Sequence, residues 1–170
     1  MVFRILQLSD CHLFSDPEEV GHLDINPTNS LQAIFDDAVK EAPDMVLFTG
    51  DISGDDSEAS YVRLHTMLEN SALPDNVRMI PGNHDVPETM TRIFGSTVCP
   101  FESWEDIGSW RIHYLDSHFE GTKGSVSDER LRALEEAVLG SPGQSHIVTV
   151  HHHPLDVIHW MDKHDWIDPV

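Results

Sequence analysis

The stretch that decides the fold is Ile5-Leu6-Gln7-Leu8-Ser9-Asp10-Cys11-His12, in which an apolar run ends abruptly in polar residues. This pattern predicts a β-strand over residues 3–8 that is followed by a polar loop. Similar apolar runs with polar ends recur over residues 45–51 and 77–85. We therefore expect three short strands, each ending in residues that can take part in chemistry.

Helical patterns separate these strands. Apolar or aromatic side chains recur at helical spacing on two segments, first at Leu31, Ile34, Phe35 and Ala38, and then at Tyr61, Leu64, His65 and Leu68. The first of these segments predicts a helix over residues 29–40. Because a strand that rejoins its sheet after a helix runs parallel to the strand before it, this alternation predicts a parallel sheet and an α/β fold. No repeat or linker interrupts the chain, so we expect one domain over residues 1–170.

The downstream part follows a looser pattern. It predicts helices over residues 87–94 and 127–139 and strands over residues 110–115 and 147–150. In the helix over 127–139, Ser127 is the expected N-cap, and Leu131, Leu134 and Val138 are expected to face inward. Residues 101–104 include a tryptophan but show no clear period.

Polar side chains follow four of the expected strands, and in a parallel sheet such strand ends collect along one edge, where α/β proteins bind ligands. The strand ends supply residues of metal-ligand type, namely Asp10 and His12, then Asp51, then Asn83, His84 and Asp85, and finally His151, His152 and His153. Each motif alone is weak, because turns and helix caps use the same residues. Together they form the mixed oxygen and nitrogen set that Mn, Fe and Zn accept.

The chemistry of a two-metal centre needs this mixture. The carboxylate of Asp51 has two oxygens and can bridge two cations, while Asp10 and His12 can reach one cation from a single loop. Asn83 and His151 are neutral ligands, which limit the negative charge and leave the cations acidic enough to ionise a bound water.

Composition excludes several partners. Ten Lys and Arg against 30 Asp and Glu give a formal net charge of −20, so we expect the chain to repel a nucleic-acid polymer. No apolar run has the length of a membrane span, and the N-terminus lacks a signal-peptide pattern. Two cysteines, Cys11 and Cys99, favour a reducing cytoplasm. Twelve histidines outnumber the Lys and Arg together, which points to metal binding.

The ordered motifs Asp10-x-His12, Gly50-Asp51 and Gly82-Asn83-His84-Asp85 resemble those of the calcineurin-like metallophosphoesterase superfamily. Within it, residues 5–14, Leu115-Asp116-Ser117 and residues 151–155 followed by Trp160-Met161-Asp162 are similar to the class III 3′,5′-cyclic AMP phosphodiesterases. The resemblance implies a four-layer α-β-β-α sandwich. It also implies two divalent or mixed-valence metal ions, with Mn, Fe and Zn as the candidates.

The resemblance also implies roles for individual residues. Asp10, His12 and Asp51 would hold one metal, and Asp51, Asn83 and His151 would hold the other. His84 would act on the leaving-group oxygen, as a proton donor or by stabilising the transition state. His152 is the alternative to His151, and His152 and Asp85 are otherwise expected to support the ligands.

The similarity breaks at the C-terminal end. The family continues into further strands and a Gly-His-x-His motif, which residues up to Val170 do not contain, and His159 and His164 lack the spacing. We expect a C-terminally incomplete sandwich and consider a fragment, a natural short form and completion by another subunit. An incomplete ligand set would bind metal weakly, and an uncovered sheet edge would favour self-association.

Three functions remain open at this point. The first is a metal-dependent phosphodiesterase in which a hydroxide bound to two metals attacks a small phosphodiester such as cyclic AMP or another cyclic nucleotide. The second is an inactive metal-binding or interaction module, and the third is a phosphoprotein or phosphomonoester phosphatase. The remaining side chains receive structural interpretations. Histidines without a motif are expected on the surface or in satisfied core positions, Cys11 is expected to pack, and the four tryptophans are expected in the core or an interface.

Overall fold

A computed structural model describes residues 2–100 and 103–155 of the chain. Its internal contacts divide the chain into two compact units, Met1–Val98 and Cys99–Val170. That one domain covers residues 1–170 stays a prediction. Within the described part of the chain, no helix combines the length and the apolar character that crossing a membrane requires.

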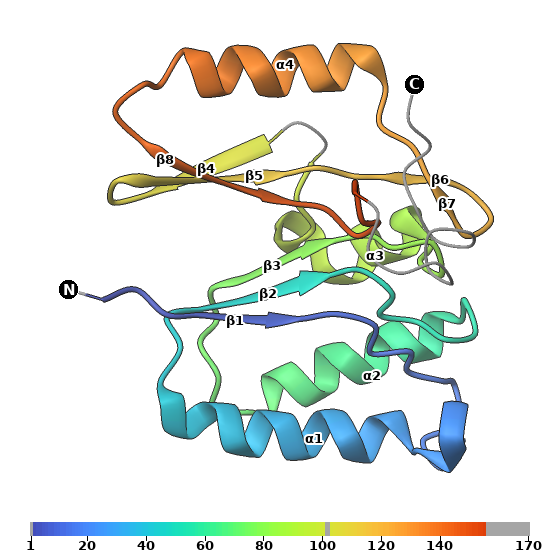
Figure 1. Cartoon of the computed structure of the whole chain (residues 1–170). Helices are drawn as coiled ribbons and strands as arrows, with labels where there is room; N and C mark the ends of the chain where they lie inside the picture. The colour runs from blue at the N-terminus through green and yellow to red at the C-terminus, as the bar shows by residue number, and fades with distance from the viewer. Residues whose placement is uncertain (1, 101–102, 156–170) are drawn as a thin grey trace. The chain divides into compact units, whose positions relative to one another are not determined.

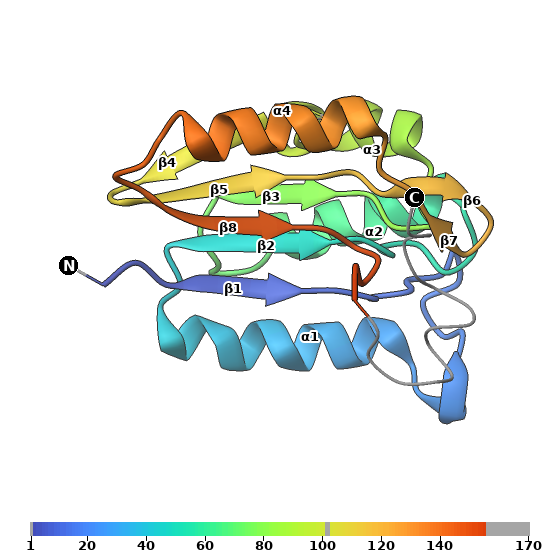
Figure 2. The same cartoon turned by 45° about the horizontal axis from the view of Figure 1, so that its top comes forward.

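The first unit contains a three-stranded parallel sheet. Its strands are β1 (Ile5–Leu8), β2 (Met45–Thr49) and β3 (Val77–Ile80), in the order β1-β2-β3. Both pairings are parallel, so the carboxyl ends of all three strands lie at one edge (Figures 1 and 2). The parallel sheet predicted from the sequence is confirmed, and β2 in its centre is buried along its whole length.

Three helices accompany this sheet, and their starts follow from local sequence. Helix α1 (Pro27–Ala38) begins with Pro27 after Asn26, whose side chain accepts a hydrogen bond from the Asn29 N–H. This cap places the start two residues before the predicted one, because proline is well suited to the first turn of a helix. Helices α2 (Glu58–Glu69) and α3 (Pro87–Phe94) follow β2 and β3.

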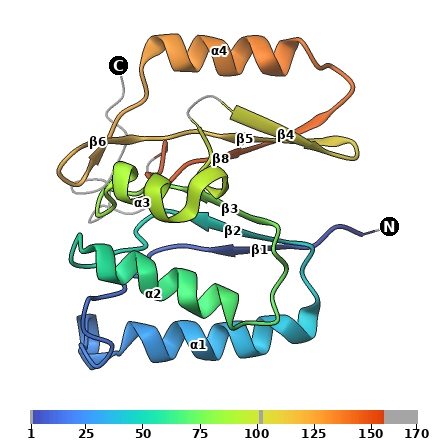
Figure 3. The ribbon, with the colours of Figure 1, turned by 180° about the vertical axis from the view of Figure 1, so that it is seen from behind.

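The core of the first unit lies between the sheet and its helices. Figure 3 shows α1 and α2 on the same face of the sheet. Their buried side chains pack with those of β2, β3 and α3 in one cluster that includes Leu31, Phe35, Phe48, Tyr61, Leu64, Met79 and Met90. Each large apolar side chain buried in this way contributes roughly 1.5–3 kcal/mol, so the cluster fixes the sheet and therefore its functional edge.

The second unit contains a mixed sheet. Its order is β4-β5-β8, in which β4 (Ser103–Ile107) is antiparallel and β8 (Ser145–Thr149) parallel to the central β5 (Trp110–Tyr114). Helix α4 (Asp128–Leu139), capped by Ser127 as predicted, connects β5 to β8 and covers one face (Figure 1). A small ribbon of β6 (His118–Glu120) and β7 (Lys123–Gly124) precedes it.

The strand β4 was not foreseen from its sequence. Ser-Trp-Glu-Asp-Ile combines an aromatic residue with two acidic residues, which are disfavoured in strands. The partner strand compensates, because Arg111 lies directly opposite Asp106 and its Nε is 2.7 Å from an Asp106 carboxylate oxygen. A cross-strand ion pair of this kind is a long-range feature that local periodicity does not reveal.

The second unit corrects two further expectations. Strand β8 pairs with β5, so His151, His152 and His153 follow a strand of a different sheet from β1, β2 and β3. Leu131 is 43% exposed instead of facing inward. Ala133, Leu134 and Ala137 of helix α4 line one cavity together with residues of β4 and β5, so this side of the helix faces the sheet. The centre of this side lies about 100° around the helix from Leu131.

The tryptophans differ in part from expectation. Trp104 and Trp110 are about half exposed, 50% and 47%, so neither is a core residue. Both lie on the β4–β5 hairpin, whose cross-strand pairs hold it together without full burial. Trp160 and Trp166 lie outside the described residues. The α/β class is confirmed, and the stacking of the two sheets in a four-layer sandwich stays a prediction.

Candidate metal centre

The loops after β1 and β2 run side by side beyond the ends of the two strands. The backbone N–H of Asp10 donates to the Gly50 carbonyl at 3.0 Å, and that of His12 donates to the Asp51 carbonyl at 3.0 Å. The ladder of the parallel sheet thus continues in these loops, which carry three of the predicted ligands. Two sequence segments about forty residues apart are thereby brought to the same place at the sheet edge.

The backbone at these ligands adopts a rare conformation. Asp10, His12 and Asp51 have φ values of 55°, 43° and 53°, in the left-handed region that side chains other than glycine seldom occupy. Each such residue costs of the order of 1–3 kcal/mol, and residues of this kind cluster at functional sites. The surrounding hydrogen bonds and the buried core hold the strained loops in place.

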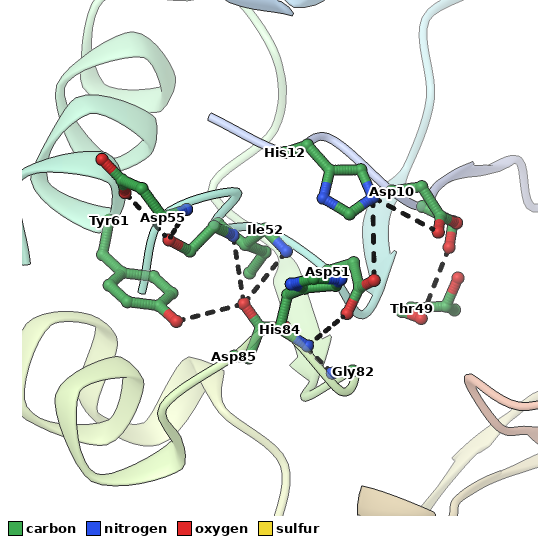
Figure 4. Close-up of polar contacts among 12 residues, drawn as sticks. Asp10, His12, Thr49, Asp51, Ile52, Asp55, Tyr61, Gly82, His84 and Asp85 are labelled. Atoms are coloured by element: carbon green, nitrogen blue, oxygen red, sulfur yellow. Dashed lines mark hydrogen bonds and ion pairs between the residues drawn. The ribbon is translucent and has the colours of Figure 1, made fainter. Parts of the chain in front are cut away.

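The side chains of these residues face one another (Figure 4). His12 Nε2 lies 3.8 Å from an Asp10 oxygen and 3.7 Å from an Asp51 oxygen. These separations are too long for hydrogen bonds. They are close to the roughly 3–4 Å that separates two ligands of one cation when each metal–ligand bond is about 2.0–2.2 Å. The group is thus spaced for a cation between its members.

His84 joins this group from the loop after β3. Its backbone N–H donates to Asp51 Oδ1 at 2.9 Å, and its ring stands edge-on to His12 with 5.2 Å between the ring centroids. His12, Asp51 and His84 each offer a ligand atom, and the three atoms lie within 4.8 Å of one another. The family resemblance implies that His84 acts on the leaving group, as a proton donor or by stabilising the transition state, whereas this spacing also permits it to be a ligand.

The donors suit the metals that the sequence predicts. A carboxylate with two imidazoles is a mixed oxygen and nitrogen set of the kind that Mn, Fe and Zn accept. Asp51 is almost completely buried, with its side chain 4% exposed, whereas the side chain of Asp10 is 58% exposed. A cation here would therefore be anchored at the buried carboxylate and reached from the side of Asp10.

Asp85 holds the loops that carry the ligands. Its Oδ1 accepts hydrogen bonds from the backbone N–H groups of Ile52 and Ser53 at 3.0 and 3.1 Å, and from the Tyr61 hydroxyl at 3.2 Å. Its Oδ2 accepts from the Gly82 N–H at 2.9 Å. Both oxygens are thus engaged, which favours a supporting role over a ligand role for this carboxylate.

Burial acts on the titration of two groups beside the ligands. Desolvation is the main factor that raises the pKa of Asp85, and hydrogen bonds to its carboxylate offset part of this effect. For Cys11, desolvation followed by the carboxylates of Asp85, Asp10 and Asp51 raises the pKa of the thiol to about 12. A thiol that stays protonated at neutral pH agrees with the packing role expected for Cys11.

Comparison with known proteins decides the family. The model of the calcineurin-like phosphoesterase family matches residues 3–169. The chain belongs to this family. It is 34% identical over 170 residues to the 3′,5′-cyclic adenosine monophosphate phosphodiesterase CpdA of Pseudomonas aeruginosa, across 98% of this chain and 59% of that protein.

Two further relatives of the chain are also named CpdA. CpdA of Vibrio vulnificus is 34% identical across 95% of the chain and 60% of its own length. CpdA of Escherichia coli K12 is 30% identical across 95% of the chain and 59% of its own length. The chain thus spans about three fifths of the length of these curated relatives.

The second unit contains the predicted histidines that follow β8. His151 is partly buried, whereas His152 is 2% exposed, and its Nδ1 lies 2.8 Å from the Ser117 hydroxyl oxygen. Two segments that the sequence singled out separately, residues 115–117 and 151–155, therefore meet. A Cβ at Gly124 would lie 2.4 Å from the His152 ring, so only glycine fits there. His159 and His164 lie outside the described residues.

Two features of the chain were not identified from its sequence, the polar contacts of Tyr61 and the pairing of two histidines. Tyr61 was taken only as part of an apolar helix face, although a buried tyrosine hydroxyl usually has a polar partner, which was the available signal. His113 and His146 were read as isolated residues, yet their rings stack with centroids 5.2 Å apart and their facing nitrogens lie 2.9 Å apart. No local pattern identifies this pair, because the two residues lie on different strands.

Proposed function

We propose that this chain carries the metal site of a phosphodiesterase whose substrate is a small cyclic nucleotide, with cyclic AMP as the first candidate. The observation that carries the proposal is the cluster of His12, Asp51 and His84 at the carboxyl edge of the β1-β2-β3 sheet. Membership of the calcineurin-like phosphoesterases and the names of the CpdA relatives support the reaction and the substrate.

The substrate class also agrees with the charge of the chain. A net charge of −20 repels a polyanion through the sum of many phosphate charges. A cyclic nucleotide brings a single phosphate charge, which bound cations can offset locally. A small phosphodiester is therefore favoured over a nucleic-acid polymer.

The proposed centre holds two cations drawn from Mn, Fe and Zn. Asp10, His12 and Asp51 would hold the first, and Asp51, Asn83 and His151 would hold the second. When bound, such cations supply Lewis acidity towards the phosphate oxygens and an ionised water as the nucleophile. Asp51 is central to both sites, because a carboxylate held by the His84 N–H on one oxygen still presents the other to His12.

The residues of the chain supply the rest of the reaction. Hydrolysis breaks one phosphorus–oxygen bond of the diester, and the leaving oxygen must gain a proton. The exposed imidazole of His84 stands next to His12 and can donate that proton. The hydrogen bond from the His84 backbone to Asp51 fixes the distance between the acid and the proposed bridging ligand.

The decisive experiment measures hydrolysis of cyclic AMP and of bis(p-nitrophenyl) phosphate, with and without added manganese. The variant Asp51→Asn should lose at least one metal and nearly all turnover, whereas Asp37→Asn on the exposed face of α1 should behave like the wild type. Metal analysis of both variants accompanies the assay. An Asp51→Asn variant with two metals and normal turnover would remove the proposed centre.

The same assay separates the alternative functions. Uptake of manganese without turnover of any phosphodiester would indicate a metal-binding module. Faster turnover of phosphopeptides or phosphomonoesters than of cyclic AMP would indicate a phosphatase. Either result would contradict the proposed phosphodiesterase.

Self-association is a further part of the proposal. Among the described strands of the second unit, β8 pairs on one side only, and its apolar residues Ile147 and Val148 are 36% and 43% exposed. An edge strand that exposes apolar residues pairs readily with another chain. We therefore expect oligomers, which light scattering at several protein concentrations will detect.

A further inference from the structure

A tyrosine hydroxyl lies in the polar network behind the candidate ligands. Tyr61, on α2, is fully buried, and its hydroxyl accepts a hydrogen bond from the Val86 N–H at 2.7 Å. The same hydroxyl donates to Asp85 Oδ1 at 3.2 Å (Figure 4). Tyr61 therefore connects the start of α3 to the buried carboxylate of Asp85.

Asp85 extends this connection to both ligand loops. Its Oδ1 holds the N–H groups of Ile52 and Ser53, which directly follow Asp51 in the sequence. Its Oδ2 holds the N–H of Gly82, which precedes Asn83 and His84. The hydroxyl of Tyr61 is thus two hydrogen bonds away from the backbone on either side of the candidate metal centre.

We propose that Tyr61 is a positioning residue for the metal centre, whose hydroxyl fixes Asp85 and through it the spacing between the Asp51 loop and the His84 loop. This inference rests on the proposed function, because it assigns a role toward the metal that function requires. Tyr61 is not itself a candidate ligand, and its hydroxyl acts through Asp85 and Val86, with a further hydrogen bond to the side chain of Ser53.

The physical reason lies in the number of hydrogen bonds that a buried carboxylate needs. Asp85 Oδ1 has three donors, of which two are backbone groups and Tyr61 is the single side chain. Without the hydroxyl, Asp85 loses one donor and the partly buried Val86 N–H loses its acceptor, so the buried carboxylate is left under-satisfied. The carboxylate is then free to shift, and the loops that it joins shift with it.

Tyr61→Phe tests this role because it removes only the hydroxyl. Removal of a residue that supports a metal ligand typically weakens binding by about 10–100-fold. Since Tyr61 acts through Asp85, we expect the affinity for Mn²⁺, measured by titration calorimetry, to fall by about tenfold, at the low end of that range. In the metal-free chain, amide exchange at Ile52, Ser53 and Gly82 should become faster.

Leu64→Val is the matched control. Leu64 is fully buried one turn along the same helix and belongs to the same core, but it makes no contact with Asp85 through a polar group. Leu64→Val should lower the melting temperature by about as much as Tyr61→Phe does. It should leave the Mn²⁺ affinity and the amide exchange at Ile52, Ser53 and Gly82 unchanged. Equal loss of affinity in both variants would reduce Tyr61 to a packing residue and overturn the inference.

A second variant protects the test against loss of folding in the first. Asp85→Asn keeps the size of the side chain but replaces one acceptor oxygen by a donor, which cannot bind the N–H groups it faces. Its loss of Mn²⁺ affinity should exceed that of Tyr61→Phe. An Asp85→Asn variant with the affinity of the wild type would overturn the inference by itself.

The outcomes distinguish this inference from the proposed function. A wild-type chain that binds Mn²⁺ but leaves cyclic AMP intact would contradict the proposed phosphodiesterase, while the comparison of Mn²⁺ affinities would still decide the role of Tyr61. Equal affinity and equal amide exchange in wild type and Tyr61→Phe would refute the positioning role and leave the phosphodiesterase standing.

Discussion

The carboxylates of Asp51 and Asp85 each hold the loop that carries the other. Asp51 accepts a hydrogen bond from the His84 backbone at 2.9 Å, and Asp85 accepts hydrogen bonds from the backbones of Ile52 and Ser53 at 3.0 and 3.1 Å. The loops after β2 and β3 are therefore braced in both directions. A metal bound between them would find its ligands already in position, which reduces the ordering cost of binding.

His84 can be tested separately from the metal ligands. His84→Ala removes the imidazole but keeps the backbone N–H that binds Asp51, so the carboxylate should stay in place. We expect unchanged metal content and a fall in turnover of about 10²–10⁴-fold, the range typical of a lost general acid. Metal analysis and initial rates on cyclic AMP check this. Loss of metal from His84→Ala would instead make His84 a ligand.

Asp55 predicts an acid-sensitive contribution to stability. Burial by itself would raise the pKa of this carboxyl, but hydrogen bonds from Ser57 and Ser15 outweigh it and lower the pKa to about 2. The folded value lies below the unfolded value of about 3.9, so the stabilisation is complete above roughly pH 4 and disappears as the pH falls toward 2.

Asp55→Asn should therefore lower the free energy of unfolding near pH 5, by about 1 kcal/mol for the lost charge-assisted hydrogen bonds. The difference from wild type should shrink toward pH 2.5. Urea unfolding across this range measures it, with the neighbouring Asp56→Asn as the control. A difference that does not change with pH would show that the ionised form of Asp55 is not what stabilises the fold.

The pair of His113 and His146 predicts a second decrease in the stability of the fold as the pH falls. Burial first, and then the charges of His146 and Arg111, lower the pKa of His113, although Asp106 acts in the opposite direction. Because the unfolded chain binds a proton at about pH 6.5 and the folded His113 resists it, stability is retained above that pH and lost below it.

His113→Gln should remove part of the loss of stability between about pH 6.5 and 5. Thermal unfolding of wild type and variant at several pH values checks this. His65→Gln, at a partly exposed position on α2, is the control. A wild-type melting temperature that stays constant over this range would contradict the predicted protonation. So would an equal change in both variants.

The edge of β8 gives a prediction about assembly. Val148→Lys places a charge on this exposed edge, a device by which natural sheets prevent pairing with other chains. Oligomer mass in light scattering should fall toward that of the monomer. Val62→Lys on α2, where Val62 is similarly exposed at 47%, should leave the mass unchanged. Equal masses for wild type and Val148→Lys would exclude β8 as the contact.

The sequence by itself determined the main helices and strands of the first unit and most of the candidate site. The strand before Asp10 and the helix from Ser127 follow from periodicity and capping, which act over a few residues. The placement of Asp10, His12 and Asp51 at one edge follows from a general rule about parallel strands, so no further knowledge of packing was needed.

The tertiary structure decided what depends on contacts between distant segments. Three features depend on long-range pairing, which periodicity does not contain. They are the position of β8 in a second sheet, the ion pair that stabilises β4 and the orientation of α4 that leaves Leu131 exposed. The same holds for Tyr61, whose role was hidden because an aromatic ring at a helical spacing reads as core. Only folding places its hydroxyl beside Asp85, because the hydrogen bond joins residues 24 positions apart.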